Sequence, residues 1–313
     1  LGLFALRAPK MHSQDAMDFF SKEGSLLLNH IMMVVMALTV LIGTIYPIVL
    51  DALGLAKLSI GAAYYNLIMG ILSIPALWFM TLSLYFTWHK SQLLRFKPLL
   101  MDMAISVVLM VLVYCYLDYG FSIWQIVLLY SAIVLLVATL KDGLKRVLAQ
   151  RKTMRSFAMV MAHIAMAVLI LGIVLNATLS LSRTVEIQQG ESLKLGSYQL
   201  QVLDHSKVQG PNYHADQLHI RVQQLGQGRH WDIYPQKRYF AAQDNQGIAK
   251  SVILHQGLSD LYVVYAQNLN AGHYVLRVYI KAYIQLVWLS GLLVLISALW
   301  AFLARRKQRR RLE

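Results

Sequence analysis

His163 is the residue whose type and position in this sequence most directly suggest chemistry. It is the one ionisable side chain in FAMVMAHIAMAVLILGIVLN (157–176), an apolar run of the roughly 20 residues that a helix needs to cross a bilayer. Three basic residues, Arg151, Lys152 and Arg155, precede the run. At a rise of about 1.5 Å per residue, His163 lies about 9 Å into this helix. Ionisable groups at such depth are rare, which makes His163 a functional-site candidate.

Two kinds of chemistry fit a histidine in this position. The side chains at helical spacing from it are apolar, and two of them are soft methionines: Met159, Val160, Met166, Ala167 and Ile170. A flat macrocycle could lie against such a surface, with His163 supplying an axial nitrogen to iron. Alternatively, a neutral His163 forms a hydrogen bond to a neighbouring helix and only holds the helices together. The residue type alone leaves both interpretations open.

A six-coordinate haem needs a second axial ligand. His30 is the only other histidine inside a predicted span, about four residues into the run 26–49. It also fits a helix-start residue near the lipid headgroups, which is the interpretation we favour. We therefore expect a structural role for His30 and keep haem ligation as the alternative.

The elements that must position His163 are membrane helices. The chain is 58% hydrophobic with a mean hydropathy of +0.52, which exceeds what a soluble globular protein of this size carries. Six apolar runs are long enough to span a bilayer: 26–49, 67–86, 99–117, 121–140, 157–176 and 283–303. The single cysteine, Cys115, lies in one of them and excludes a disulfide framework or a cysteine-based metal site. The first residues, LGLFAL, are too few to span, and we expect them to be the tail of an upstream helix.

The positive charges predict how these helices are oriented. The formal net charge of +14 is concentrated in the connections, with three Lys or Arg in 7–25, one in 50–66, three in 87–98, none in 118–120, six in 141–156 and six in 304–313. The positive-inside tendency places the basic connections in the cytoplasm and 50–66, 118–120 and 177–282 on the opposite side. This pattern indicates topology and predicts no nucleic-acid partner.

Residues 182–282 have a different character. Apolar and polar side chains alternate in YQLQVLD (198–204) and LHIRVQQL (218–225), which indicates strands with one buried face. Further strands are expected at 183–187, 261–266 and 274–280, with Gly-rich turn signals between them. The sequence predicts a small all-β domain, a sandwich or a barrel, tethered at both ends by membrane helices.

The predicted β domain favours binding or positioning over catalysis. Six of the ten histidines fall in it: His205, His214, His219, His230, His255 and His273. None has the paired spacing of a zinc site, and the sequence lacks a phosphate loop, a Ser/His/Asp signature and a nucleotide fingerprint. In the helical part, Asp102 follows Pro98 at a predicted helix start, where the helix dipole favours an acid, so we expect a structural role.

Several segments along the whole chain resemble the C-terminal half of the CcmF/NrfE family, the large membrane subunit of a haem lyase that matures c-type cytochromes. They are LFALRAPK (3–10), LIGTIYPIVLDALGLAKLSIG (41–61), Met159 with Ala162 and His163, Gly210-Pro211-Asn212, Lys237-Arg238-Tyr239, Asp260-Leu261-Tyr262, and Leu276-Arg277 with Tyr279 and Lys281. Three positions depart from the family pattern: Ala158-Met159 follows Phe157 where aromatic-Gly-Met is usual, Ala282 replaces a proline, and Ser259 replaces an arginine.

The resemblance implies that His163 is one of two transmembrane histidines that ligate a b-type haem, with quinol as a possible electron source. It implies that the first ligand, a Trp-rich haem-handling motif and two further haem-binding histidines lie in the upstream half of the same protein. It also implies as partners the haem chaperone CcmE, the accessory subunit CcmH and apocytochrome c. On this basis this chain alone is expected to be inactive.

The sequence thus predicts a membrane α-helical bundle with an inserted small all-β extracytoplasmic domain. The expected parts are 1–25, an upstream tail and cytoplasmic loop; 26–181, five transmembrane helices; 182–282, the periplasmic β domain; 283–303, the last transmembrane helix; and 304–313, a basic cytoplasmic tail. The expected location is the bacterial inner membrane. Alternatives are a non-catalytic scaffold that docks periplasmic partners and a haem transporter, which is disfavoured because we find no inverted repeat.

Overall fold

The computed structural model describes residues 20–55, 57–88, 96–117, 119–149, 153–240, 247–270 and 272–309. The chain divides into two compact units, one of residues 1–170 with 290–313 and one of residues 171–289, and each is described by itself. The expected upstream tail, residues 1–6, lies outside the described residues.

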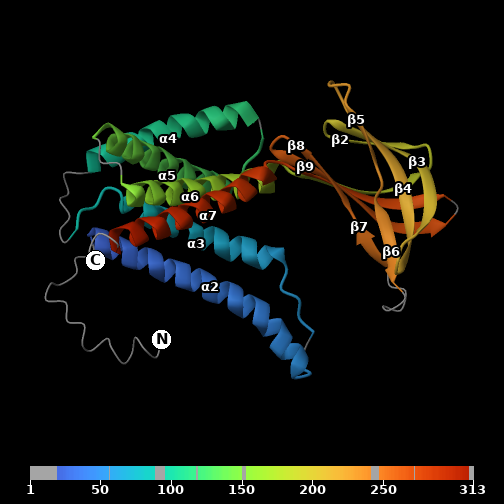
Figure 1. The fold of residues 1–313 in the computed structure, drawn as a ribbon, viewed down its shortest axis with the longest axis horizontal. Helices are drawn as coiled ribbons and strands as arrows, with labels where there is room; N and C mark the ends of the chain where they lie inside the picture. The colour runs from blue at the N-terminus through green and yellow to red at the C-terminus, as the bar shows by residue number, and fades with distance from the viewer. Residues whose placement is uncertain are drawn as a thin grey trace. The chain divides into compact units, whose positions relative to one another are not determined.

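Six helices in the described part are long and apolar enough to cross a membrane, which confirms the multi-pass helical class. They are α2 (Lys22–Ala52), α3 (Ala62–Leu82), α4 (Phe96–Leu117), α5 (Ile123–Leu148), α6 (Met154–Leu179) and α7 (Ile284–Arg309). Figure 1 shows α2 running beside α3, and α4 beside α5. Large apolar side chains remain exposed along α2 and α4, as expected for helices whose outer faces meet lipid.

Local signals explain where the helices begin and how closely they pack. Ser21 caps α2 by accepting a hydrogen bond from the Gly24 backbone N–H at 3.1 Å. Ser122 and Gln125 form a capping box at the start of α5. Gly43 lets α2 approach α3, because a Cβ at this position would lie 2.9 Å from the Tyr64 ring. The caps fix where α2 and α5 begin, and Gly43 allows the close packing of α2 on α3.

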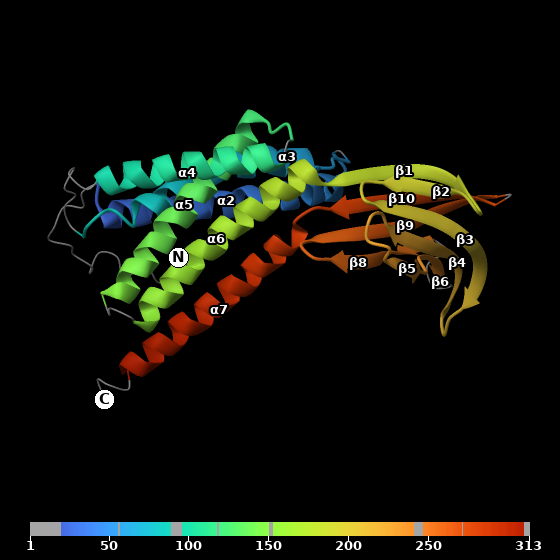
Figure 2. The same cartoon turned by 90° about the horizontal axis from the view of Figure 1, so that it is seen from above.

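Between α6 and α7 the chain forms a β-sandwich of two antiparallel sheets. One sheet has the order β1-β10-β9-β8, and the other has the order β2-β3-β4-β6-β7 with β5 also paired to β4. The strands are β1 (Leu181–Gln188), β2 (Ser192–Leu195), β3 (Tyr198–Gln209), β4 (Tyr213–Gln224), β5 (His230–Ile233), β6 (Gln236–Phe240), β7 (Gly247–Lys250), β8 (Val252–Gln256), β9 (Ser259–Asn270) and β10 (His273–Lys281). Figure 2 shows β1, β10 and β9 side by side.

The alternation seen in the sequence builds the core of the sandwich. Leu200 and Val202 of β3, Leu218 and Ile220 of β4, and Leu276 of β10 are fully buried between the two sheets. The alternating neighbours, such as Gln201 and Arg221, are exposed. The inserted all-β domain is therefore confirmed, and of the two architectures expected it is the sandwich.

Candidate functional site

His163 lies in α6 and has one ring nitrogen already committed. Its Nδ1 is 2.9 Å from the backbone oxygen of Met159, four residues earlier in the helix. A carbonyl oxygen only accepts hydrogen bonds, so Nδ1 carries the proton and a neutral ring has its lone pair on Nε2. Nε2 has no hydrogen-bond partner among the described residues. This arrangement suits a metal ligand, since a fixed Nδ1–H orients the ring and leaves the Nε2 lone pair available.

The half of α6 that carries His163 is held by α5 and α7. A Cβ at Gly143 of α5 would lie only 3.2 Å from the Val160 side chain, so the two helices meet closely there. From α7, Ser297 Oγ donates a hydrogen bond to the Ala158 backbone oxygen at 2.7 Å, and Trp300 packs against Phe157. Contacts on both sides of the same helical segment fix the rotation of α6 and therefore the direction of the imidazole.

The side chains around His163 provide a mixed apolar surface. Of the five neighbours expected from helical spacing, Ala167 and Ile170 are buried, while Met159, Val160 and Met166 are partly exposed. Small and soft side chains beside an imidazole nitrogen with a free lone pair are compatible with a flat macrocycle on iron, so the residues present fit the group that the sequence suggests. His163 remains a predicted ligand.

His30 repeats the geometry of His163 on another helix. Its Nδ1 is 2.6 Å from the Leu26 backbone oxygen, so its Nε2 also bears the lone pair. Because α2 begins at Lys22, His30 lies eight residues beyond the first helical residue, about 12 Å along the axis. The side chain is exposed within its unit. His30 is thus further from the helix start than expected, and both the ligand and the structural interpretation stay predictions.

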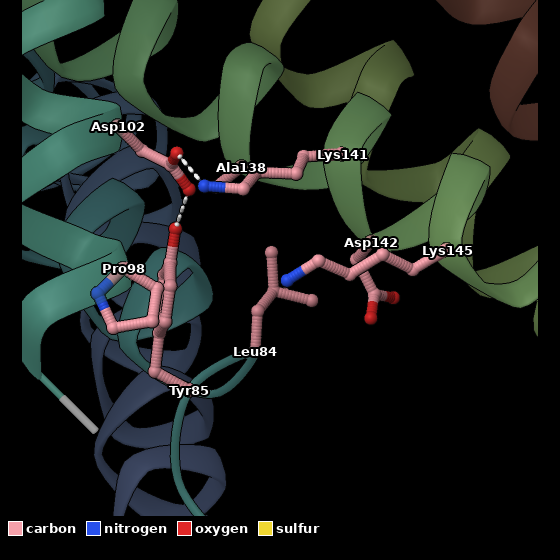
Figure 3. Close-up of a pocket in the computed structure, with 8 residues that line it drawn as sticks. All are labelled: Leu84, Tyr85, Pro98, Asp102, Ala138, Lys141, Asp142 and Lys145. Atoms are coloured by element: carbon pink, nitrogen blue, oxygen red, sulfur yellow. Dashed lines mark hydrogen bonds and ion pairs between the residues drawn. The ribbon is translucent and has the colours of Figure 1, made fainter. Parts of the chain in front are cut away.

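A buried carboxylate forms a second polar centre in the helical unit. Asp102 of α4 is 1% exposed, and its Oδ1 lies 2.5 Å from Lys141 Nζ of α5. Tyr85, just after α3, donates its hydroxyl to Oδ2, and Figure 3 shows Lys141 and Tyr85 both directed at Asp102. Burial, and then the hydrogen bond to Asp102, raise the pKa of Tyr85, so the hydroxyl stays protonated.

The contacts of Asp102 correct the expectation that the helix dipole stabilises this acid. The sequence indicated an acid stabilised by the dipole at a helix start, but Asp102 lies six residues after Phe96, beyond the first turn of α4. The acid is instead neutralised by Lys141, which is 39 residues away in the sequence. A cavity of about 270 Å³ adjoins this centre, with Asp142 and Lys145 also in its wall. The structural role expected for Asp102 stays a prediction.

The six histidines of the sandwich are dispersed. Among the described residues, no three histidine, cysteine or acidic side chains lie close enough together to hold a metal ion. His205, His214 and His219 stack on tyrosines, whereas His255 and His273 donate to Asp260 and Glu186. His205 and His219 each keep a buried Nε2 without a hydrogen-bond partner, and within the described ranges these histidines form no group of three possible metal ligands.

The sandwich joins α6 and α7 through a compact set of hydrogen bonds, here called the junction. Asn176 of α6 donates to the Ala282 backbone oxygen at 2.8 Å, and the Ala282 N–H donates to Ser180 Oγ at 3.1 Å. The Tyr283 N–H donates to Ser259 Oγ at 3.2 Å. The chain turns at Tyr283 with a φ of 55°, a left-handed conformation that is uncommon for a residue other than glycine.

Comparison with known proteins places these features in one family. Residues 178–282 match the family described as the CcmF C-terminal beta-sandwich. The cytochrome c-type biogenesis protein CcmF of Pseudomonas aeruginosa is 32% identical over 98% of this chain and 47% of the relative. The chain is similar to the C-terminal half of the CcmF proteins. CcmF of Escherichia coli K12 and NrfE of Haemophilus influenzae are each 28% identical over 98% of the chain and 48% of the relative.

A solved structure supports the same fold. The structure named Cytochrome c Heme Lyase CcmF matches 91% of this chain and 46% of its own with a TM-score of 0.74 at 18% identity. The chain spans about half the length of the CcmF relatives that it matches.

Two of the three positions where the sequence is expected to depart from the family pattern, Ser259 and Ala282, lie in the junction. Ala282 supplies the N–H that donates to Ser180 Oγ, and Ser259 supplies the hydroxyl oxygen that accepts from the Tyr283 N–H. Sequence reasoning did not find the junction or the Asp102–Lys141 pair. The available signals were Asn176 and Ser180 at the end of an apolar run, and a lysine at the end of the fourth span.

Proposed function

We propose that this chain is the C-terminal part of a CcmF-type haem lyase subunit that acts in cytochrome c maturation at the bacterial inner membrane. The names of its relatives support this role, because they are cytochrome c-type biogenesis proteins. In the assembled lyase, each haem vinyl group gains the sulfur and hydrogen of a cysteine thiol in a Cys-x-x-Cys-His segment and becomes a thioether. The upstream half of the protein is required for this activity.

His163 is proposed as the residue that would ligate the iron of a b-type haem through Nε2. The observation that carries this proposal is the Nδ1–H···O bond to Met159, which leaves Nε2 as the free basic nitrogen. A bound haem would supply one-electron transfer, with quinol as the proposed donor and the iron of the incoming haem as acceptor. Contacts from α5 and α7 hold the segment of α6 that carries the ring, and the upstream half is proposed to supply the second ligand.

The sandwich is proposed to face the periplasm and to present a docking surface for CcmE, CcmH and apocytochrome c. The junction supports this role, because hydrogen bonds at Asn176, Ser180 and Ser259 connect the sandwich to its two membrane helices without a flexible linker.

The ligand assignment is tested by spectroscopy. The chain is co-expressed with the upstream half of a CcmF protein, purified in detergent, and its dithionite-reduced absorption spectrum is recorded. We expect the b-type α-band to be lost in His163→Gly and to return when imidazole is added, because a free imidazole can occupy the vacated position. His214→Ala, on the sandwich surface, is the control and should leave the band unchanged.

The imidazole arm separates loss of a ligand from loss of the fold. An unchanged band in His163→Gly would contradict the assignment, and so would a lost band that imidazole does not restore in a variant that still assembles with the upstream half. His30→Ala reports on the second candidate ligand in the same assay.

The alternative function is a non-catalytic scaffold in which His163 is only structural. The specific observation in its favour is the same Met159 hydrogen bond, which also satisfies Nδ1 of a partly buried imidazole with no metal. A scaffold predicts that His163→Ala preserves both partner assembly and cytochrome c maturation in cells. A ligand role predicts that assembly survives and maturation is lost.

A further inference from the structure

A groove of about 420 Å³ lies on the outer face of the four-stranded sheet, away from the core of the sandwich. It is lined by Tyr262, Val264, Arg277, Tyr279 and Lys281. The three β10 residues alternate with Leu276 and Val278, which are fully buried, so they share the outer face. Tyr262 of β9 lies directly opposite Tyr279 in the register. The sequence Arg-x-Tyr-x-Lys thus builds one continuous surface.

The cations of this groove have no acidic partner. Neither Arg277 nor Lys281 forms an ion pair with a carboxylate in the described ranges of the chain. Asp260, the register neighbour of Lys281, is already bound by His255 Nδ1 and Gln285 Nε2, each at 2.8 Å from its Oδ1. By contrast, Arg221 on the other sheet donates to Asp232 and lowers the pKa of that carboxyl group. The groove therefore has two positive charges that no carboxylate of the described residues neutralises.

The remaining polar groups of the groove also donate. Tyr262 accepts a hydrogen bond from Ser251 Oγ at 2.8 Å, which leaves the tyrosine proton available for an acceptor. Lys281 Nζ lies 5.3 Å from the centre of the Tyr279 ring, which draws this cation toward the middle of the groove. None of the five lining residues carries a carboxylate. A groove with two cations and tyrosine hydroxyls that can donate, and with no carboxylate in its lining, is complementary to a carboxylate or a phosphate.

The walls between the cations are aromatic and apolar. The Tyr262 and Tyr279 rings are 6.1 Å apart at 69°, and Val264 continues the surface. Tyrosine and arginine are the residue types that dominate binding energy at interfaces, and the groove volume is within the range of small-molecule sites. A ligand that fits has an extended apolar body and carries more than one anionic group.

We propose that this groove binds a flat aromatic dicarboxylate of the porphyrin class, with Arg277 and Lys281 each pairing with one carboxylate and the tyrosine rings contacting the macrocycle. The choice of a porphyrin rests on the proposed function, in which haem is the substrate. The groove positions the ligand by its propionates and takes no part in iron ligation. It gives the sandwich a direct role in holding the substrate.

The test uses the full chain in a neutral detergent and metal-free protoporphyrin IX as the probe, followed by fluorescence anisotropy. Without iron the probe cannot be ligated by any histidine. We expect the Arg277→Gln/Lys281→Gln variant to bind at least tenfold more weakly than the unmodified chain, and the unmodified chain to bind protoporphyrin dimethyl ester at least tenfold more weakly than the free acid. The control, Arg183→Gln/Lys194→Gln, removes two exposed cations of the same sandwich and should bind as the unmodified chain does.

Three results would overturn the proposal. They are equal affinity for the acid and the ester, equal affinity of the groove variant and the control, or displacement of the porphyrin by phosphatidylglycerol micelles at equal concentration, which would make the groove a lipid headgroup site. The outcome is independent of the haem ligand, because His163→Ala should retain the binding of the metal-free probe. A failed spectroscopic test at His163 with a successful porphyrin titration would reject the proposed ligand and keep the groove.

Discussion

At the scale of single residues, hydrogen bonds to the backbone decide what the polar side chains of this chain can do. Met159 and Leu26 fix the Nδ1 protons of His163 and His30, and each leaves Nε2 with the lone pair. An imidazole held by the preceding helical turn needs no second side chain to set its tautomer. The same local bond is therefore compatible with metal ligation and with simple burial, and only a measurement of the bound group separates them.

The Ala282→Pro substitution tests one hydrogen bond of the junction, from the Ala282 N–H to Ser180 Oγ. Ala282 is buried, and its N–H donates to Ser180 Oγ, so proline removes a donor and leaves the hydroxyl without it. We expect the free energy of unfolding to fall by about 1 kcal/mol, measured by denaturant or thermal unfolding in detergent. Ser180→Ala should cost a similar amount, and the double variant little more than either single one. Ser182→Ala, at an exposed position of β1, is the control, and additive losses would show that the two groups are not coupled.

At the scale of elements, small residues and buried polar pairs set the spacing of the helices. A Cβ at Gly172 of α6 would lie 2.9 Å from Leu286 Cβ and 3.1 Å from the Val287 backbone nitrogen of α7. Only glycine lets the ends of these two helices approach so closely beside the sandwich. Gly291, one turn further along α7, has no atom within 4 Å of its Cβ position, so the close approach is local.

The Asp102–Lys141 pair connects α4 to α5. Removing only the lysine should lower the free energy of unfolding more than removing both charges. Lys141→Met leaves the Asp102 carboxylate buried without its cation, which we expect to lower the free energy of unfolding by about 3–5 kcal/mol. Asp102→Asn combined with Lys141→Met removes both charges and should recover most of that loss, because the Tyr85 hydrogen bond can persist. The measurement is thermal unfolding in detergent.

Lys145→Met is the matched control for this pair. Lys145 lines the same cavity, and it has no bonded carboxylate among the residues that the structure describes. If Lys141→Met and Lys145→Met had equal effects, the pair would not be the contact that holds α4 to α5.

How much could be predicted depended on whether a signal was local in the sequence. The six spans and the long strands β3, β4, β9 and β10 carry strong apolar patterns, and the fold class followed from them. Short strands such as β5 and β7, with four residues each, give too few alternations to recognise. The partners of Asp102 and Ala282 are 39 and 102 residues away, and no periodicity in one sequence specifies which distant side chains meet.

At the scale of the whole molecule, the distribution of charge predicts on which side of the membrane each part lies. Residues 141–156 contain six Lys or Arg. Between these residues and the sandwich lies one candidate membrane span, α6. The positive-inside tendency therefore places the connection after α5 in the cytoplasm and the sandwich in the periplasm. This assignment is a prediction, and the docking role proposed for the sandwich depends on it.

Cysteine labelling tests this topology, because the chain has a single natural cysteine to remove. In a Cys115→Ser background, Gln227→Cys places a thiol on an exposed turn of the sandwich, and Ala149→Cys places one at the exposed end of α5. A membrane-impermeant maleimide added to spheroplasts should label Gln227→Cys at once and Ala149→Cys only after the membrane is opened with detergent. The Cys115→Ser background should stay unlabelled throughout. Labelling of Ala149→Cys in closed spheroplasts, or protection of Gln227→Cys, would reverse the orientation and remove the basis for a periplasmic docking surface.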